Sequence, residues 1–238
     1  MSAKEDLERL VSVPPGERLS IRERERWRFE GLEMDSLRRA AVLLLFGPLD
    51  AAPAHAHSTA VPDDLDVLLI ERAGTLADHP GQVAFPGGGI DPGDAGPEAA
   101  ALREAVEETG LDASGVDILG TLPDIPLSVS RFMVTPVLAW WTLPSPVAVV
   151  DFNESAQVFR IPVADLLEPA NRYTSVLRRA GTIHRGPAFT VNDLVVWGFT
   201  ATLLSHLFDE LGWAQEWDRS REIPAPLPPG RPEDARRQ

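Results

Sequence analysis

The stretch LLIERAGTLADHPGQVAFPGGGIDPGDAGPEAAALREAVEETGL, residues 68–111, carries most of what the sequence says about fold and chemistry. It places an apolar run before a glycine-rich turn, and then a helix with several acidic residues. Glu104, Glu107 and Glu108 are spaced i, i+3 and i+4, so their carboxylates share one helical face. Hard divalent cations prefer oxygen ligands, and such a face can gather them. The stretch therefore favours metal-assisted attack of water on a phosphate compound.

The helix is expected to run from about Glu98 to Thr109. Pro97 suits the first turn of a helix, and Gly110 suits its end. The expected inward stripe follows the spacing i, i+3, i+4 and i+7 and consists of Leu102, Ala105, Val106 and Thr109. The acidic residues are therefore expected to face away from that stripe, partly toward whatever occupies the cleft.

Strand and helix patterns alternate along the rest of the chain, which indicates an α/β protein. The expected strands are Ala40–Phe46, Val67–Ile70, Val116–Leu122, Phe132–Trp141, Gln157–Arg160 and Tyr173–Leu177. The first two are expected to form a hairpin with an insertion at its tip. Pro136 predicts that its strand lies at an edge or carries a bulge.

Two further helices are expected near the C-terminal end. The first is short and spans Ile161–Leu167. The second spans Leu194–Leu211, with Asn192 or Asp193 as its cap and Gly212 as its end.

Composition and charge divide the chain and exclude several classes of protein. We expect a charged, partly helical extension at 1–36, a main domain at 37–218 and a proline-rich, disordered tail at 219–238. Cysteine is absent, which excludes disulfides, thiolate metal sites and a cysteine nucleophile. The net charge of −14 disfavours nucleic-acid binding, and a phosphate substrate would therefore need cations beside it. The charged start and the lack of a long apolar run predict a soluble, cytoplasmic protein with no membrane contact.

The glycine turn and the helix together resemble the Nudix box. Gly88 is followed by five residues, Asp94, eight residues and then the sequence REAVEETGL from Arg103 to Leu111. The common form of the box has Glu where Asp94 stands, and a spacer one residue shorter. The resemblance implies a Nudix-like α/β/α sandwich with a mixed β-sheet, in which the box helix packs on one face and the final helix on the other.

Both departures resemble one branch of the family, the coenzyme A pyrophosphatases. That branch has a signature upstream of the box, which is matched by Leu68, Leu69, Arg72, Ala73, Gly81, Phe85, Pro86, Gly87 and Gly88. Ile70 replaces a Thr and Ala77 replaces a second Arg of this signature. The resemblance implies coenzyme A or its thioesters as substrate, with 3′,5′-ADP and 4′-phosphopantetheine as products.

The resemblance also implies roles for individual residues. The expected ligands of Mg²⁺ or Mn²⁺ are Glu104, Glu107, Glu108 and the Gly87–Gly88 backbone. Arg103 is expected to orient a catalytic carboxylate with Asp94 as its partner, and either Glu104 or Glu154 is expected to accept the proton. The expected substrate contacts are Arg72, His79, Gln82 and Phe85.

Two other functions stay open at this point. One is a Nudix hydrolase of another substrate, such as ADP-ribose, a dinucleotide or a nucleoside triphosphate. The other is a non-catalytic nucleotide-sensing module on the same fold, although a pure binder need not keep all of the carboxylates. A homodimer is expected by family analogy alone.

Overall fold

The computed structural model describes residues 2–14, 36–48, 54–75, 80–127, 131–179 and 181–227. Its helices are α1 (Ala3–Ser12), α3 (Pro97–Thr109), η3 (Ala113–Gly115), α4 (Val163–Leu167), η4 (Pro169–Asn171) and α5 (Gly198–Leu211). Its strands are β1 (Arg38–Pro48), β2 (Leu65–Arg72), β3 (Val83–Ala84), β4 (Gly87–Gly89), β5 (Val116–Thr121), β6 (Ile125–Leu127), β7 (Phe132–Trp141), β8 (Ser155–Pro162), β9 (Arg172–Arg179), β10 (Thr182–Val191), β11 (Leu194–Val196) and β12 (Glu222–Pro224).

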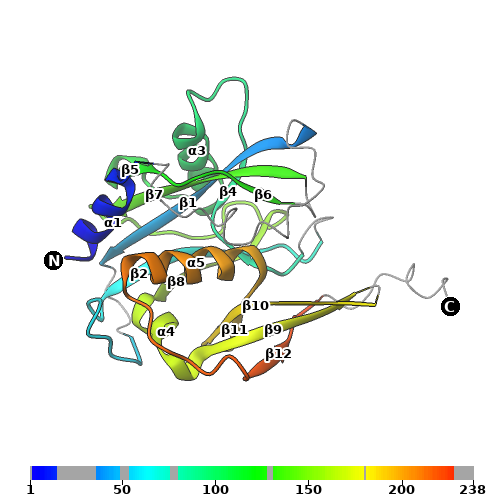
Figure 1. The fold of residues 1–238 in the computed structure, drawn as a ribbon. Coiled ribbons are helices and arrows are strands. Elements are labelled where there is room, and N and C mark those ends of the chain that lie inside the picture. Colours follow the sequence, from blue (N-terminus) through cyan, green and yellow to red (C-terminus); the bar gives the residue numbers. More distant parts are fainter. Residues whose placement is uncertain are drawn as a thin grey trace.

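Within these ranges, eight strands form a mixed sheet and four strands form a second sheet. The first sheet has β1 at its centre, parallel to β7 and antiparallel to β2 and β4. The second sheet follows the order β11-β10-β9-β12 and extends away from the first (Figure 1). The expected hairpin of β1 and β2 is confirmed, with Phe46 opposite Val67.

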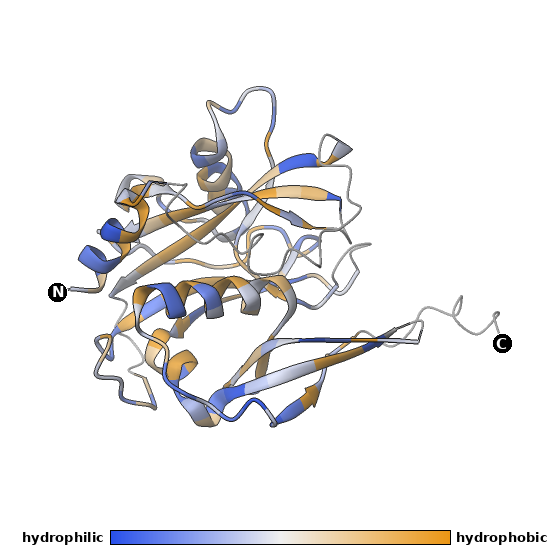
Figure 2. Ribbon diagram, in the orientation of Figure 1, coloured by the Kyte–Doolittle hydropathy of each residue, from blue (hydrophilic) through white to orange (hydrophobic). Residues whose placement is uncertain are grey.

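Helices cover both faces of the first sheet, as expected for an α/β/α sandwich (Figure 1). The apolar side chains of α3 and those of α5 pack into two separate clusters of buried residues. On the α3 side, alanines pack against β1 and β7, so the helix lies close to the sheet. On the other side, α5 buries most of its apolar residues together with two threonines, and its ribbon carries both hydrophobic and hydrophilic residues (Figure 2).

The N-terminal helix α1 belongs to this second cluster. Leu7 is completely buried and Leu10 nearly so, while the Trp213 Nε1 donates a hydrogen bond of 3.1 Å to Asp6. A capping box between Ser2 and Glu5 starts the helix. The first turns of the chain are therefore part of the core, whereas 15–35 lie outside the described residues.

Three expectations about secondary structure are wrong. The final helix begins at Gly198 and not at Leu194, because residues 194–196 form β11. Asn192 and Asp193 both have positive φ and form the turn between β10 and β11, so neither caps the helix. Two consecutive residues with positive φ are the requirement of a type I′ hairpin turn.

The second correction concerns Pro136, because its strand β7 is central and not an edge. A bulge does occur in its pairing with β5, where Leu119 is an extra residue between Ile118 and Gly120. Strand β7 has β1 on one side and β5 and β6 on the other. The Pro136 carbonyl accepts from the Leu122 amide, so the missing N–H of Pro136 points to the junction between β5 and β6. The proline is tolerated because pairing is already interrupted there.

The third correction concerns the tail. Residues 222–224 form β12, which pairs in parallel with β9 through Ile223 opposite Ser175. The expected disorder of 219–238 is therefore wrong for β12, while residues 228–238 lie outside the described part. No helix in the described ranges has the length and apolar character that a membrane span requires.

Candidate active site

The short strand β4, which consists of three glycines, holds the glycine-rich turn against the box helix α3. Gly88 pairs with Ala41 of β1, and a Cβ at Gly88 would lie 2.6 Å from both carboxylate oxygens of Glu104. Gly87 has a φ of 155°, and a Cβ there would collide with the backbone of Ala41. Both glycines are therefore needed for the close approach of backbone and carboxylate.

Arg103 is the centre of a network of charged side chains. Its Nε and Nη2 each donate to one oxygen of Asp94 at 3.0 Å, and Nη2 also donates to the Gly89 carbonyl at 3.1 Å. Its Nη1 donates to Glu104 at 2.9 Å and to Glu107 at 3.2 Å. The expected partnership of Arg103 with Asp94 is confirmed, and Arg103 holds two of the three helical carboxylates.

Asp94 is itself held by the turn that precedes the helix. Its side chain is 7% exposed, and its Oδ2 accepts from the Asp91 amide at 2.8 Å. The hydrogen bonds from Arg103 and Asp91 keep the pKa of Asp94 below its usual value. Sequence reasoning missed Asp91, although an Asp three residues before another Asp in a glycine-rich loop is a signal for such a turn.

Glu108 is buried beside two residues of the expected inward stripe, so the expectation that the acidic residues face away from that stripe is wrong for Glu108. It is 4% exposed, and its Oε2 accepts from the Gly87 amide at 2.9 Å. Burial raises the pKa of Glu108 to about 7, against the effects of the Gly87 amide and the nearby Arg72 charge. The helix turns this carboxylate toward the glycine strand because Glu108 adjoins the buried Thr109 and lies i+3 from Ala105.

The other acidic residues surround Glu108 with negative charge. Burial raises the pKa of Glu104, and the charges of Glu107 and Glu154 act in the same direction. Glu154 is exposed in the turn immediately before β8, and its charge also acts on Glu108. The structure therefore brings Glu104, Glu107, Glu108 and Glu154 into one electrostatic neighbourhood, although 46 residues separate Glu108 from Glu154 in the sequence.

The four expected substrate contacts differ in their burial and in whether the structure describes them. Arg72 and Gln82 are half-buried and joined through the Arg72 amide, which donates to the Gln82 carbonyl at 3.0 Å. Phe85 is 3% exposed and packs in the α5-side core, so its expected contact with substrate is not supported. His79 lies outside the described residues, as does Ala77.

The carboxylates of the box helix are oxygen ligands of the kind that a hard cation prefers, although they do not form an enclosed metal site. Within the described residues, no three Asp, Glu or His side chains converge as a closed metal site. One positively charged nitrogen of Arg103 nevertheless lies between Glu104 and Glu107, at 2.9 and 3.2 Å from their oxygens. The fit to a divalent ion therefore rests on the chemistry of these carboxylate oxygens, which are the ligands that hard cations prefer.

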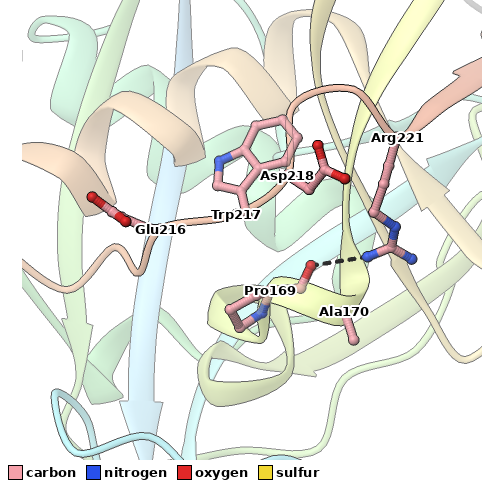
Figure 3. Close-up of a pocket in the computed structure, with 6 residues that line it drawn as sticks. All are labelled: Pro169, Ala170, Glu216, Trp217, Asp218 and Arg221. Carbon is pink, nitrogen blue, oxygen red and sulfur yellow. Dashed lines mark hydrogen bonds between the residues drawn. The ribbon is translucent and has the colours of Figure 1, made fainter.

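A separate cavity of about 400 Å³ lies beside the second sheet (Figure 3). It is lined by η4 and by residues 216–218, and Arg221 closes one side by donating to the Pro169 carbonyl at 3.1 Å. None of the expected site residues lines it. The carboxylate network on α3 is therefore the candidate active site, rather than this hollow.

Comparison with known proteins agrees with this geometry. Residues 54–179 match the NUDIX domain family. The chain is 40% identical over 146 residues to a protein of Cronobacter sakazakii described as an uncharacterized Nudix hydrolase, NudL, covering 61% of this chain and 75% of that protein. It is 38% identical over 147 residues to the NudL of an Enterobacter species, with the same coverage.

A Nudix hydrolase of known structure is also among the similar proteins. The Nudix hydrolase RenU of M. smegmatis has 21% sequence identity and a TM-score of 0.49, over 76% of this chain and 90% of that one. Nudix hydrolases generally use divalent metal ions and act on small nucleotide substrates. The chain belongs to the Nudix family, and it is a hydrolase that acts on a nucleoside diphosphate linked to a further group.

Proposed function

We propose that the protein hydrolyses the diphosphate bond of coenzyme A or its thioesters. The products would be 3′,5′-ADP and 4′-phosphopantetheine, or its acyl form. The observation that carries the reaction type is the Arg103 network, which holds Asp94, Glu104 and Glu107 beside the glycine strand. The proposed substrate is supported by the sequence signature upstream of the box, which retains Arg72 and the Phe-Pro-Gly-Gly turn.

We propose that Glu104, Glu107, Glu108 and a backbone oxygen of Gly87 or Gly88 would hold Mg²⁺ or Mn²⁺. When bound, such an ion neutralises phosphate charge and lowers the pKa of water. The protein supplies the donor set and holds it in place. Arg103 fixes Glu104 and Glu107, and the Gly87 amide fixes Glu108. Binding a cation requires Arg103 to give up part of its hold on Glu104 and Glu107.

Glu154 is proposed as the proton acceptor. The Glu104 Oε1 already accepts from Arg103, and the Glu108 Oε2 accepts from the Gly87 amide. Among the described residues, no side-chain hydrogen bond occupies the Glu154 carboxylate, which is exposed. Its backbone is fixed, because the Glu154 carbonyl accepts from the Ala73 amide at 2.8 Å. An anchored carboxylate with free oxygens can take a proton from water.

Arg72 is proposed to contact the diphosphate of the substrate. The proposal is supported by the charge of Arg72, which acts to lower the pKa of Glu108. Arginine suits this role because its planar guanidinium can bind two phosphate oxygens at once. Gln82 is proposed as a second contact, and a homodimer stays a prediction from family analogy.

A substrate panel tests this proposal. Coenzyme A, an acyl thioester, ADP-ribose, a dinucleotide and a nucleoside triphosphate are incubated with Mg²⁺ or Mn²⁺, and the products are resolved by mass. Release of 4′-phosphopantetheine from coenzyme A, at a higher kcat/KM than for the other compounds, is the expected result. Comparable or faster turnover of ADP-ribose would contradict the coenzyme A specificity.

One difference from the sequence signature of the coenzyme A branch is the reason for testing the alternative substrates. Ala77 stands where the coenzyme A branch carries a second Arg, so one cation that could contact a phosphate is missing. A substrate with fewer phosphates, such as ADP-ribose, would depend less on it. A non-catalytic sensing module is not supported, because all three helical carboxylates are present and held in place, Glu104 and Glu107 by Arg103 and Glu108 by the Gly87 amide.

A further inference from the structure

The pairing of β2 and β8 changes at one point beside the candidate active site. Glu71 pairs with Gln157, but Arg72 pairs with Ser155, so Ala156 is an extra residue on β8. Such a β-bulge re-aims the side chains that follow it. Regular alternation would place Ala156 opposite Arg72, and the bulge places Ser155 there instead. Burial agrees, because Ser155 is 0% exposed while Ala156 is exposed.

Ser155 lies on the face of the sheet that α3 covers. Leu68 packs with the alanines of α3, and Arg72 lies four residues further along the same strand, so both side chains point to that face. Directly opposite residues of an antiparallel pair share a face, so Ser155 points there as well. It is also the chain neighbour of Glu154. The bulge thus brings a hydroxyl to the active-site side of the sheet.

Two polar atoms at this position lack partners. The Ser155 Oγ and the Arg72 Nε are both buried, and neither forms a hydrogen bond within the described residues. Buried polar groups in native proteins are nearly always paired, and unpaired ones are costly. The arginine Nε is a donor and the serine hydroxyl can accept, so these two atoms are chemically complementary.

We propose that Ser155 is a positioning residue for Arg72. Its Oγ accepts a hydrogen bond from the Arg72 Nε when the guanidinium engages the substrate diphosphate. This bond fixes the plane of the guanidinium, so that the two terminal nitrogens face the phosphate oxygens together. The inference rests on the proposed contact between Arg72 and the substrate, but not on which diphosphate the substrate is.

A double-mutant cycle tests the coupling of the two residues. Ser155→Ala, Arg72→Gln and the double variant are assayed with whichever diphosphate the unmodified protein hydrolyses fastest. Ser155→Ala is expected to raise KM by about tenfold, as expected for one lost hydrogen bond. In the Arg72→Gln background the same change is expected to have no further effect. Wild-type kinetics for Ser155→Ala, or additive effects in the double variant, would overturn the proposal.

Ser175→Ala is the matched control. Ser175 is a buried serine of the second sheet, 5% exposed, and its hydroxyl donates to the Gly186 carbonyl at 3.1 Å. Its loss is expected to leave KM unchanged. If KM rises equally in Ser175→Ala and Ser155→Ala, the rise is a general effect of removing a buried hydroxyl. That result would overturn the role assigned to Ser155.

A measurement without turnover separates this inference from the proposed function. The Arg72 Nε–H resonance is assigned by NMR from its absence in Arg72→Gln, and its hydrogen exchange is measured with methylenediphosphonate and Mg²⁺. Exchange is expected to slow on binding in the unmodified protein but not in Ser155→Ala. Equal exchange in both proteins would overturn the inference. Failure of the unmodified protein to hydrolyse any diphosphate would instead overturn the proposed function.

Discussion

The buried Glu108 carboxylate makes a specific prediction about stability in the absence of metal. Its pKa is about 7 in the folded protein, against an ordinary value of 4.5 for a glutamate in water. A group whose pKa is raised by folding favours the folded state below the unfolded pKa, and this stabilisation is lost as pH rises through the folded pKa. A pKa raised from 4.5 to about 7 corresponds to about 3 kcal/mol, at ~1.4 kcal/mol for each tenfold change in proton affinity.

Glu108→Gln isolates this contribution, because the amide is neutral at every pH and its oxygen can still accept from the Gly87 amide. Urea unfolding is followed between pH 4.5 and 8 in EDTA for both proteins. The unfolding free energy of the unmodified protein is expected to fall by about 3 kcal/mol relative to Glu108→Gln over this range. Added Mg²⁺ is expected to restore much of the loss at pH 8 in the unmodified protein alone, because a bound cation favours the ionised carboxylate.

Parallel pH profiles for the two proteins would refute this reasoning. They would mean that Glu108 is either solvated or already neutralised by Arg72. Asp117→Asn provides a control for the removal of one carboxylate, because Asp117 is exposed and lies outside the site. Its difference from the unmodified protein is expected to stay constant between pH 5 and pH 8.

The other predictions concern catalysis. Gly88→Ala is expected to lower kcat about 10²-fold in steady-state assays, because its Cβ would displace the Glu104 carboxylate; an unchanged kcat would show that Glu104 has room to move. Arg103→Lys is expected to lower kcat by about 10–100-fold, because Lys cannot bridge Asp94 and the helical carboxylates as a planar fork does. Wild-type activity in that variant would remove Arg103 from the account. Glu154→Gln is expected to lower kcat by about 10²–10⁴-fold without loss of Mn²⁺ affinity, and a loss of Mn²⁺ affinity would make Glu154 a ligand instead.

The box helix was predictable because its determinants are local. The proline at its start, the left-handed Gly110 at its end and the spacing of its carboxylates all lie within one short stretch. The ion pair of Arg103 with Asp94 was also predictable, since both residues belong to the same motif. Local sequence is sufficient where a structure depends on neighbours along the chain.

The remaining features depend on contacts between distant segments. The burial of Glu108 follows from β4, which pairs with β1 and offers the Gly87 amide to the helix. The hydrogen bond between Asp6 and Trp213 joins opposite ends of the sequence, and no local pattern predicts it. The bulge that turns Ser155 toward the site exists only in the register of β8 against β2.

Manganese binding tests the central claim most directly. Free Mn²⁺ is measured by electron paramagnetic resonance during titration of the unmodified protein, of a variant with Glu104, Glu107 and Glu108 all changed to Gln, and of Glu98→Gln, which alters an acidic residue in the first turn of the same helix. The unmodified protein and Glu98→Gln are expected to remove Mn²⁺ from solution, whereas the triple variant is not. Equal Mn²⁺ uptake by all three proteins, or uptake by none, would contradict the account.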